Sequence, residues 1–270
     1  MISKILAFRM SILALALSFN AIAVTAQQVD STSDASALAV VEKSILAMGG
    51  RATWRSFGAA TVNAQITPER GPERHVAWSD DWSTGRVRFR RDAVDVQAKH
   101  AYIVGSDETQ IHKKPDGTPE QLKQDHGIAV LALGYPAPAL ILSTLKYHCV
   151  FHFDQKSGPE VNQAPADTNT IVIAERCPHP VSSAGAATIM WTFSKSTGLP
   201  TQVVLPIQGL KTNVIRSQTV IYNTFRSVQG ALTPLSLSIR RVSGSVDKVT
   251  FDSPVFLDGL SDQTFTTSNQ

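Results

Sequence analysis

Hydrophobic positions recur at two different spacings along the chain, and the change between them divides it into predicted elements. Residues 34–48 carry apolar side chains three and four residues apart, a spacing that predicts an amphipathic helix. The apolar positions of this helix are Leu38, Val41, Ile45 and Met48. Asp34 is expected to cap its start, and the pair Gly49-Gly50 to end it in left-handed backbone.

From residue 59 onward the apolar side chains fall at every second position, which predicts β-strands with one buried and one wet face. Short polar or Gly/Pro turns separate the runs, so the strands are expected to pair as an antiparallel meander. The pattern predicts about ten or eleven strands in one domain without a linker. The runs lie at 59–67, 76–78, 87–89, 94–96, 147–153, 170–176, 187–194, 201–207, 214–225, 233–242 and 246–252.

Helical spacing returns in the middle of the chain. Thr118-Pro119-Glu120-Gln121 has the capping-box spacing with proline at the first helical position, which predicts a helix reaching Leu133. Gly134 and Pro136 are expected to end that helix. Residues 139–145 predict a second short helix with apolar side chains on nearly all sides. Such a helix is either part of the core or faces another apolar surface.

The composition leaves a soluble globular protein as the broad class. Of 270 residues, 43% are hydrophobic, which is too many for a disordered chain. The 16 Gly and 14 Pro are too few for a collagen-like chain. Two cysteines cannot build a disulfide scaffold or a four-thiolate zinc site.

The first 26 residues have the layout of a cleaved secretory signal peptide. Lys4 and Arg9 are basic, residues 10–17 are almost wholly apolar, and small residues precede a cut after Ala26 or Ala23. The alternative is a membrane anchor, since the uncharged stretch is long enough to span a bilayer. The sequence favours a periplasmic or secreted protein, with residues 27–270 as a single domain.

Loss of the signal peptide brings the charges close to balance. Removing Lys4 and Arg9 from 25 basic residues leaves 23, against 22 acidic ones, so no general attraction to nucleic acid is expected. The densest basic stretch is Arg86-Val87-Arg88-Phe89-Arg90-Arg91. Its arginines are expected on the solvated face of a strand. The alternative is a patch that binds anionic headgroups or phosphates.

Familiar catalytic motifs are absent from the sequence: there is no Gly-x-Ser-x-Gly, His-Glu-x-x-His, phosphate loop or dinucleotide-binding glycine pattern. The chain is therefore predicted not to be an enzyme and to need no cofactor. A hydrolase whose residues converge only in space stays open as an alternative.

The cysteines and nearby histidines include zinc-compatible ligand types, namely His148, Cys149, His152, Cys177 and His179. On a strand, however, Cys149 points to the face opposite His148 and His152, so a metal site is not expected. A Cys149–Cys177 disulfide is predicted instead, with free thiols as the alternative. A hairpin centred on Gln163 also places Phe153 opposite Ile173.

The C-terminal third carries motifs of a known superfamily. Phe193–Pro200 reads as a strand and a Gly-Leu-Pro turn, with Ser194 where such turns often carry Asp. Residues 220–234 read Tyr-x-x-Phe-Arg-x-Val-x-Gly-x-x-x-Pro from Tyr222 onward, and Asp262 to Phe265 form an Asp-x-x-Phe tail. This order resembles the periplasmic lipoprotein-carrier superfamily, of the LolA/LolB and LppX/LprG types. The opening helix ending at Gly49-Gly50 resembles the first helix of that superfamily.

The resemblance implies a mainly β fold with some helix: an incomplete antiparallel β-barrel covered by an N-terminal helix and central lid helices. Such proteins bind a lipid, an acyl chain or a lipidated protein in the concave face. Pockets of this kind are lined by hydrophobic side chains. The candidates for the ligand-binding lining are Trp78, Phe89, Trp191, Phe193, Leu237, Ile239 and Phe251, and those for the lid are Leu133, Leu140, Ile141 and Leu142.

Each of these residues has an alternative role as ordinary core. The runner-up function is a non-enzymatic adaptor or structural protein of the cell envelope, with the barrel filled by its own side chains and a partner protein docked on an edge strand. In either case we expect a monomer, with peripheral membrane contact and no nucleic-acid partner.

Overall fold

The computed structural model divides the chain into two units, residues 1–32 and residues 33–270. It describes residues 33–85, 87–93, 101–104, 110–113, 118–122, 127–154, 169–177, 188–208 and 215–266, all in the second unit. The predicted signal peptide and the predicted strand at 94–96 lie outside the described residues. Among the described helices, none is long and apolar enough to cross a membrane.

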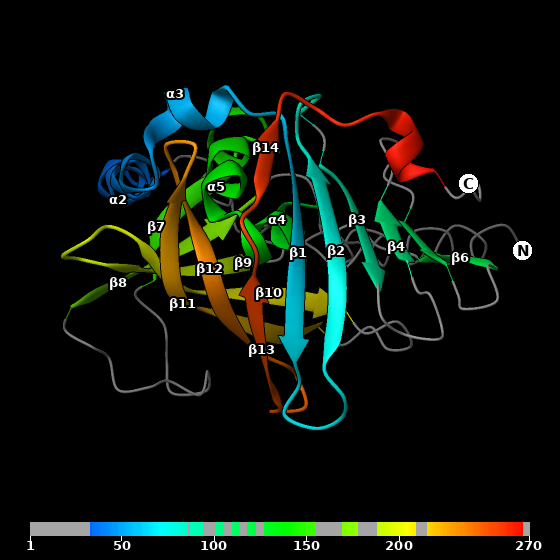
Figure 1. The fold of residues 1–270 in the computed structure, drawn as a ribbon. Helices are drawn as coiled ribbons and strands as arrows, with labels where there is room; N and C mark the ends of the chain where they lie inside the picture. Colours follow the sequence, from blue (N-terminus) through cyan, green and yellow to red (C-terminus); the bar gives the residue numbers. More distant parts are fainter. Residues whose placement is uncertain are drawn as a thin grey trace, which may run out of the picture. The chain divides into compact units, whose positions relative to one another are not determined.

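One antiparallel sheet of 14 strands forms most of the described unit (Figure 1). Its order is β6-β5-β4-β3-β2-β1-β13-β12-β11-β10-β9-β8-β7, and β14 pairs with the start of β1. Within the described residues, β6 and β7 are the two edges, so the sheet curves without closing. This confirms a mainly β fold with an incomplete antiparallel barrel. The strands are β1 (Ala59–Thr67), β2 (Arg74–Asp81), β3 (Arg88–Ala93), β4 (Ala101–Val104), β5 (Gln110–Lys113), β6 (Pro119–Leu122), β7 (Val150–Phe153), β8 (Thr170–Arg176), β9 (Thr188–Ser194), β10 (Pro200–Gln208), β11 (Ile215–Val228), β12 (Ala231–Arg240), β13 (Val246–Phe251) and β14 (Val255–Leu257).

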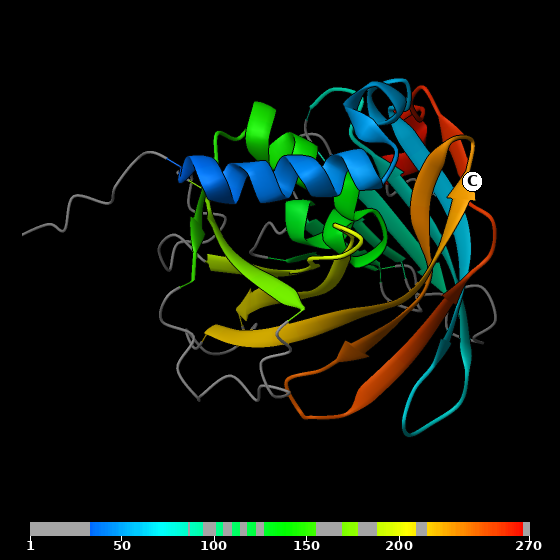
Figure 2. The same cartoon turned by 90° about the vertical axis from the view of Figure 1, so that its left-hand side faces the viewer.

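Helices lie against the concave side and one end of this sheet (Figures 1 and 2). The helix α4 (Gly127–Gly134) leads directly into α5 (Pro136–Leu145), and these two pack together. The helix α2 (Ala35–Ala47) packs on α5 and β7, and α3 (Gly50–Arg55) packs on α5 and β12. A short 3-10 helix, η1 (Asp262–Phe265), packs on β3.

The core lies between these helices and the concave face. The alternation predicted for β9 is observed, because Ile189, Trp191 and Phe193 are buried while the residues between them are half-buried. The predicted helix face of α2 is observed too, since Val41, Ile45 and Met48 are buried and Leu38 is partly buried against them. Eight consecutive residues of α5, from Pro136 to Ser143, are buried. The apolar helix is therefore part of the core.

The structure corrects the predicted boundaries of the helices. Residues 119–122 form the edge strand β6, which pairs with β5, and the following helix starts only at Gly127. Proline is tolerated on an edge strand, so Pro119 fits there as well as at a helix start. Pro136 begins α5 instead of ending the previous helix. Strands β4, β5, β6 and β14 were not among the predicted runs.

The predicted cap and stop of the first helix are partly right. Gly49 and Gly50 have φ values of 114° and 81°, as a left-handed stop requires, but Gly50 also begins α3. Asp34 precedes α2 without a side-chain cap hydrogen bond. Its carboxylate instead accepts a hydrogen bond from the backbone N–H of Phe153 at 3.4 Å, because the helix start is docked against β7.

The predicted Cys149–Cys177 disulfide is present, just beyond the paired ends of β7 and β8. The predicted register is also confirmed, with Phe153 opposite Ile173. Strand alternation and symmetric spacing were therefore sufficient to pair these two strands.

The arginine stretch is not the solvated strand face that we predicted. Arg88 is only 4% exposed and forms ion pairs with Asp81 and Asp262, and Phe265 of η1 packs on its guanidinium group. Arg91 lies on the concave face, where its guanidinium group is 4.3 Å from the Trp78 ring centre. Both arginines pair with buried carboxylates, Arg88 with Asp81 and Arg91 with Asp80. Arg86 lies outside the described residues.

Candidate functional site

A groove of about 470 Å³, lined mainly by apolar side chains, opens at the end of the sheet where β1 begins and β2 ends. One wall is a face of α5, and the other comes from α3, the segment that follows it and the turn after β2. The lining residues are Trp54, Arg55, Ser56, Phe57, Gly58, Trp82, Ser83, Pro138, Ile141, Leu142, Leu145, Lys146 and Asp258. We refer to this set as the rim groove.

The α5 wall follows from helical periodicity. Pro138, Ile141, Leu142 and Leu145 are spaced three, one and three residues apart, which places them on one face. Ile141 and Leu142 are 7% and 8% exposed, whereas Leu145 at the end of the helix is 47% exposed. This wall is therefore packed into the core at Ile141 and Leu142 and ends in the half-exposed Leu145.

Aromatic rings build the opposite wall. The indole N–H of Trp54 donates to the Met48 carbonyl at 2.8 Å, and that of Trp82 to the Phe57 carbonyl at 2.9 Å. Phe57 stacks on Phe256 with ring centres 4.8 Å apart. Because the polar N–H groups of both indoles are satisfied, only apolar ring surface remains for contact with a ligand.

Gly58 also lines the groove, and a close approach between backbone segments holds it in place. A Cβ on Gly58 would lie 1.8 Å from the Asp258 carbonyl oxygen, so only glycine fits there. The Gly58 N–H donates to the Leu257 carbonyl at 2.7 Å, and its own carbonyl accepts from the Trp82 N–H at 2.7 Å. These bonds hold β14 and the turn after β2 at the groove.

Two of the predicted ligand-binding residues, Ile141 and Leu142, line the rim groove. The others are buried elsewhere: Trp78, Phe89, Leu140, Trp191, Phe193, Leu237, Ile239 and Phe251. Leu133 is partly buried against the same core. Their contact with a ligand stays a prediction. Sequence reasoning missed Trp54, Phe57, Trp82 and Leu145, although the helical spacing from Pro138 to Leu145 was visible in the sequence.

A buried polar cluster lies on the concave face near the junction of α4 and α5. Arg91 donates to Oδ1 of Asp80 at 2.6 Å, whereas Oδ2 of Asp80 has no hydrogen-bond partner among the described residues. Burial raises the pKa of Asp80, against the opposing effect of Arg91. Burial and the nearby Asp80 raise the pKa of Tyr135 well above its usual value. This cluster is enclosed, and it contributes no residue to the rim groove.

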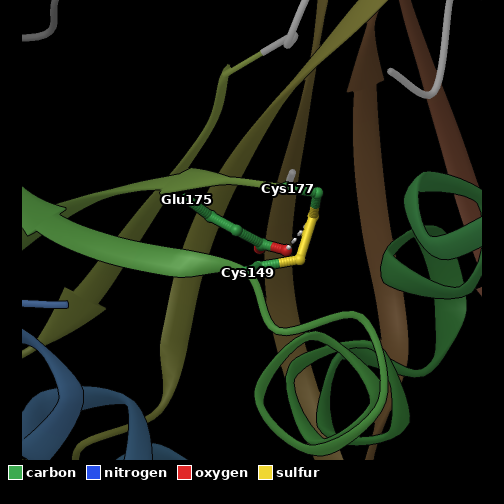
Figure 3. Close-up of side chains that lie close together, drawn as sticks. All are labelled: Cys149, Glu175 and Cys177. Carbon is green, nitrogen blue, oxygen red and sulfur yellow. Dashed lines mark hydrogen bonds between the residues drawn. A yellow bond between two sulfur atoms is a disulfide. The ribbon is translucent and has the colours of Figure 1, made fainter. Parts of the chain in front are cut away.

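A second buried carboxyl lies beside the disulfide (Figure 3). Glu175 is fully buried, and its Oε1 lies 3.6 Å from Sγ of Cys177. Ser143 donates to Oε1, and the Trp191 indole donates to Oε2 at 2.6 Å. Burial raises the pKa of Glu175 despite these two donors.

Cys149, Glu175 and Cys177 are also of ligand type for a metal ion, with donor atoms within 4.8 Å of one another. Thiolates are the form of cysteine that binds zinc, and here the two sulfurs are bonded to each other. The cluster as it stands therefore does not suit a zinc ion.

The fold and the groove together define a class of protein: an open antiparallel half-barrel with helices on its concave side and an apolar groove at one end. Within that class the fold is LolA-like. A DUF1329 family protein from Desulfovibrio piger aligns over 85% of this chain and 97% of its own, with 9% identity and a TM-score of 0.56. A LolA superfamily protein from Nitrosomonas europaea aligns over the same fractions, with 14% identity and a TM-score of 0.51.

At these identities the likeness concerns the fold. Neither a protein-family model nor a curated protein matches the sequence. The resemblance read from the C-terminal motifs is thus confirmed at the level of architecture.

Proposed function

We propose that the protein is an exported carrier that binds an apolar chain, from a lipid or a lipidated protein, in the rim groove. The observation that carries this proposal is the pair of apolar walls, one helical and one aromatic, around about 470 Å³. That volume lies within the usual range for ligand pockets, roughly 300–1,000 Å³. The LolA-like fold supports the same class of ligand.

Burial of apolar surface supplies the driving force. Each 100 Å² of apolar surface removed from water contributes roughly 2.5 kcal/mol. Leu145 already exposes 47% of its surface beside the aromatic wall, so a chain in the groove would cover it. We infer that the groove binds an apolar chain, because its walls offer mainly hydrophobic contact beside the polar lining residues Arg55, Ser56, Ser83, Lys146 and Asp258.

Export is supported by two features. The N-terminal 26 residues have the pattern of a signal peptide, and disulfides persist in oxidising compartments such as the periplasm. In this proposal the mature protein begins near Gln27. N-terminal sequencing of the exported protein measures this directly.

Leu145→Asp tests the groove with little risk to folding, because Leu145 is half exposed. We expect this variant to bind a fluorescent fatty acid about tenfold more weakly, since about 1.4 kcal/mol of contact is lost. Leu46→Asp is the matched control, because Leu46 is 73% exposed and does not line the groove. Binding is measured by fluorescence titration, and an organic extract of the purified protein is analysed by mass spectrometry.

The adaptor role is the second candidate, and one observation favours it. The barrel residues predicted to line the ligand site are all under 9% exposed, so their side chains are packed in the core. If no lipid co-purifies and no probe binds at micromolar concentration, the carrier role is wrong and the adaptor role is preferred.

A further inference from the structure

Glu175 occupies a position where the strand pattern calls for an apolar residue. It follows Ile171 and Ile173 on the concave face of β8 and is 0% exposed. An ionised carboxylate without a cationic partner is costly to bury, by several kcal/mol. The groups that face Glu175 are Ser143 of α5, Trp191 of β9 and the disulfide.

The described residues that pair with Glu175 on the neighbouring strands are uncharged. They are Phe151 of β7 and Ile189 of β9. The causes acting on its pKa are burial and the two hydrogen bonds, with no charged residue among them. Among the described residues, Glu175 is thus surrounded by neutral groups, and the protonated form is favoured over a wider pH range than for an exposed glutamate.

The hydrogen bonds assign the proton to one oxygen. An indole N–H can only donate, so Oε2 must accept from Trp191. The acid proton is then on Oε1, which faces the Ser143 hydroxyl and Sγ of Cys177. A hydroxyl can donate or accept, so Ser143 fits either protonation state of Glu175.

We propose that Cys149–Cys177 is a thiol–disulfide exchange site in which Glu175 donates a proton to the Cys177 sulfur. The partner is a dithiol donor. A disulfide confined to a structural role has no need of a buried acid 3.6 Å from one sulfur. This site is separate from the rim groove and does not depend on the function proposed for it.

The exchange balances in two steps. A thiolate of the donor attacks Sγ of Cys149, the disulfide breaks with its electron pair on Sγ of Cys177, and Oε1–H of Glu175 protonates that sulfur. The donor's second thiolate then attacks the donor sulfur of the mixed disulfide, closing the donor's own disulfide and releasing Cys149. Solvent protonates Cys149 and Glu175. Two electrons and, overall, two protons pass from the dithiol to the two cysteines.

The geometry also selects which sulfur leaves. Cys177 is the leaving group because the acid lies beside its Sγ, so the mixed disulfide forms on Cys149. The two cysteines are 6% and 8% exposed, so a small opening is needed for attack. With glutathione, a monothiol, the mixed disulfide is expected on Cys149 in the wild-type protein.

Glu175→Gln removes the proton donor while keeping the shape of the side chain. We measure reduction of the native protein by dithiothreitol at several pH values, with acid quench and thiol alkylation. Rates are divided by the concentration of dithiothreitol thiolate. The wild-type rate should fall as pH rises through the pKa of Glu175, whereas the variant should be slower at low pH and insensitive to pH. The expected loss is roughly tenfold to a hundredfold, at or below the lower end of typical general-acid effects.

Glu73→Gln, at an exposed glutamate, serves as the control and should behave as the wild type. Equal, pH-independent rates in the wild type and Glu175→Gln overturn the proposal, as does a disulfide that resists dithiothreitol until the protein unfolds. Peptide mapping of the glutathione adduct needs no variant. An adduct on Cys177 also overturns the proposal, even if Glu175→Gln fails to fold.

Discussion

Asp80 and Glu175 are both buried carboxyls on the concave face of one sheet, yet they are satisfied in different ways. Asp80 on β2 pairs with the guanidinium group of Arg91, which in turn stacks on Trp78. Glu175 on β8 has two neutral donors, Ser143 and Trp191. Burial raises the pKa of both groups, but only Asp80 has a cation that opposes this effect.

This difference in hydrogen-bonding partners distinguishes a structural carboxyl, Asp80, from one that can exchange its proton, Glu175. The Asp80–Arg91 pair keeps its charges only while both partners are present, because either charge alone would be buried without compensation. Glu175 can lose or gain its proton with the same two hydrogen-bonding partners in place, because the Ser143 hydroxyl can donate or accept. The sheet thus holds a carboxyl committed to an ion pair at Asp80 and, in our proposal, an acid that can act at Glu175.

Breaking the ion pair should have the largest effect. Arg91→Met leaves Asp80 without its cation, and we expect the free energy of unfolding at pH 7 to fall by about 3–5 kcal/mol. Urea unfolding followed by circular dichroism measures this. The double variant Asp80→Leu/Arg91→Met should recover most of the loss, because no charge remains buried. A single variant within about 1 kcal/mol of the wild type would mean that Asp80 takes up a proton instead.

Removing the disulfide should have the next largest effect. Cys149→Ala/Cys177→Ala removes a cross-link between two residues that are 28 positions apart in sequence, so the unfolded chain gains conformational freedom. We expect about 3–4 kcal/mol of lost stability, again measured by urea unfolding. The single variant Cys149→Ala is a useful companion, since it breaks the same bond and should lose a similar amount. A double variant as stable as the oxidised wild type would contradict this prediction.

The smallest expected effects are changes in how the free energy of unfolding depends on pH in two single variants. The folded-state pKa of Glu175 is raised, so its stabilising effect is full below the unfolded pKa and is lost as pH rises through the folded value. Glu175→Gln should abolish that decline. Burial acts to raise the pKa of Asp81, but the hydrogen bonds that Ser83, Leu260 and Arg88 donate to its carboxylate together outweigh burial and lower the pKa.

Asp81 therefore stabilises the fold above its unfolded pKa and loses that effect as pH falls through the folded value. Asp81→Asn should cost about 1–2 kcal/mol at pH 7 and progressively less below about pH 4. Unfolding midpoints measured between about pH 3 and pH 8 compare the two variants. The stability lost on substitution should fall with rising pH for Glu175→Gln and grow with rising pH for Asp81→Asn. A change in the same direction for both variants would refute the assignment of opposite pKa shifts.

The sequence predicted those strands whose two faces differ. The ranges predicted for β1 and β8 coincide with the observed strands. In β1 the two faces differ, because Val62 and Ala64 are buried while Asn63 and Gln65 are exposed, so a one-residue shift would bury the polar face. It failed at β6, where the capping-box signature of Thr118 to Gln121 is local and the pairing with β5 is not. Local propensity gives way to pairing in such cases.

The rim groove was only half visible in the sequence. The α5 wall follows from spacing alone, but the aromatic wall comes from two segments, Trp54 to Phe57 and Trp82, which meet only in the folded chain. The buried Glu175 did leave a signal, because a charged residue at a concave-face position of β8 breaks the alternation. The same holds for Arg91, which shares a face with Phe89 on β3.

The docking of Ser33 and Asp34 on β7 has a consequence for self-association. An open sheet has edges, and unpaired backbone groups on an edge strand are a template for pairing with another chain. On β7 the Phe151 N–H donates to Ser33 Oγ at 3.1 Å, and the Phe151 carbonyl accepts from the Asp34 N–H at 2.9 Å. Two residues ahead of the first described helix thus occupy the hydrogen-bonding positions that a second copy would need to extend the sheet.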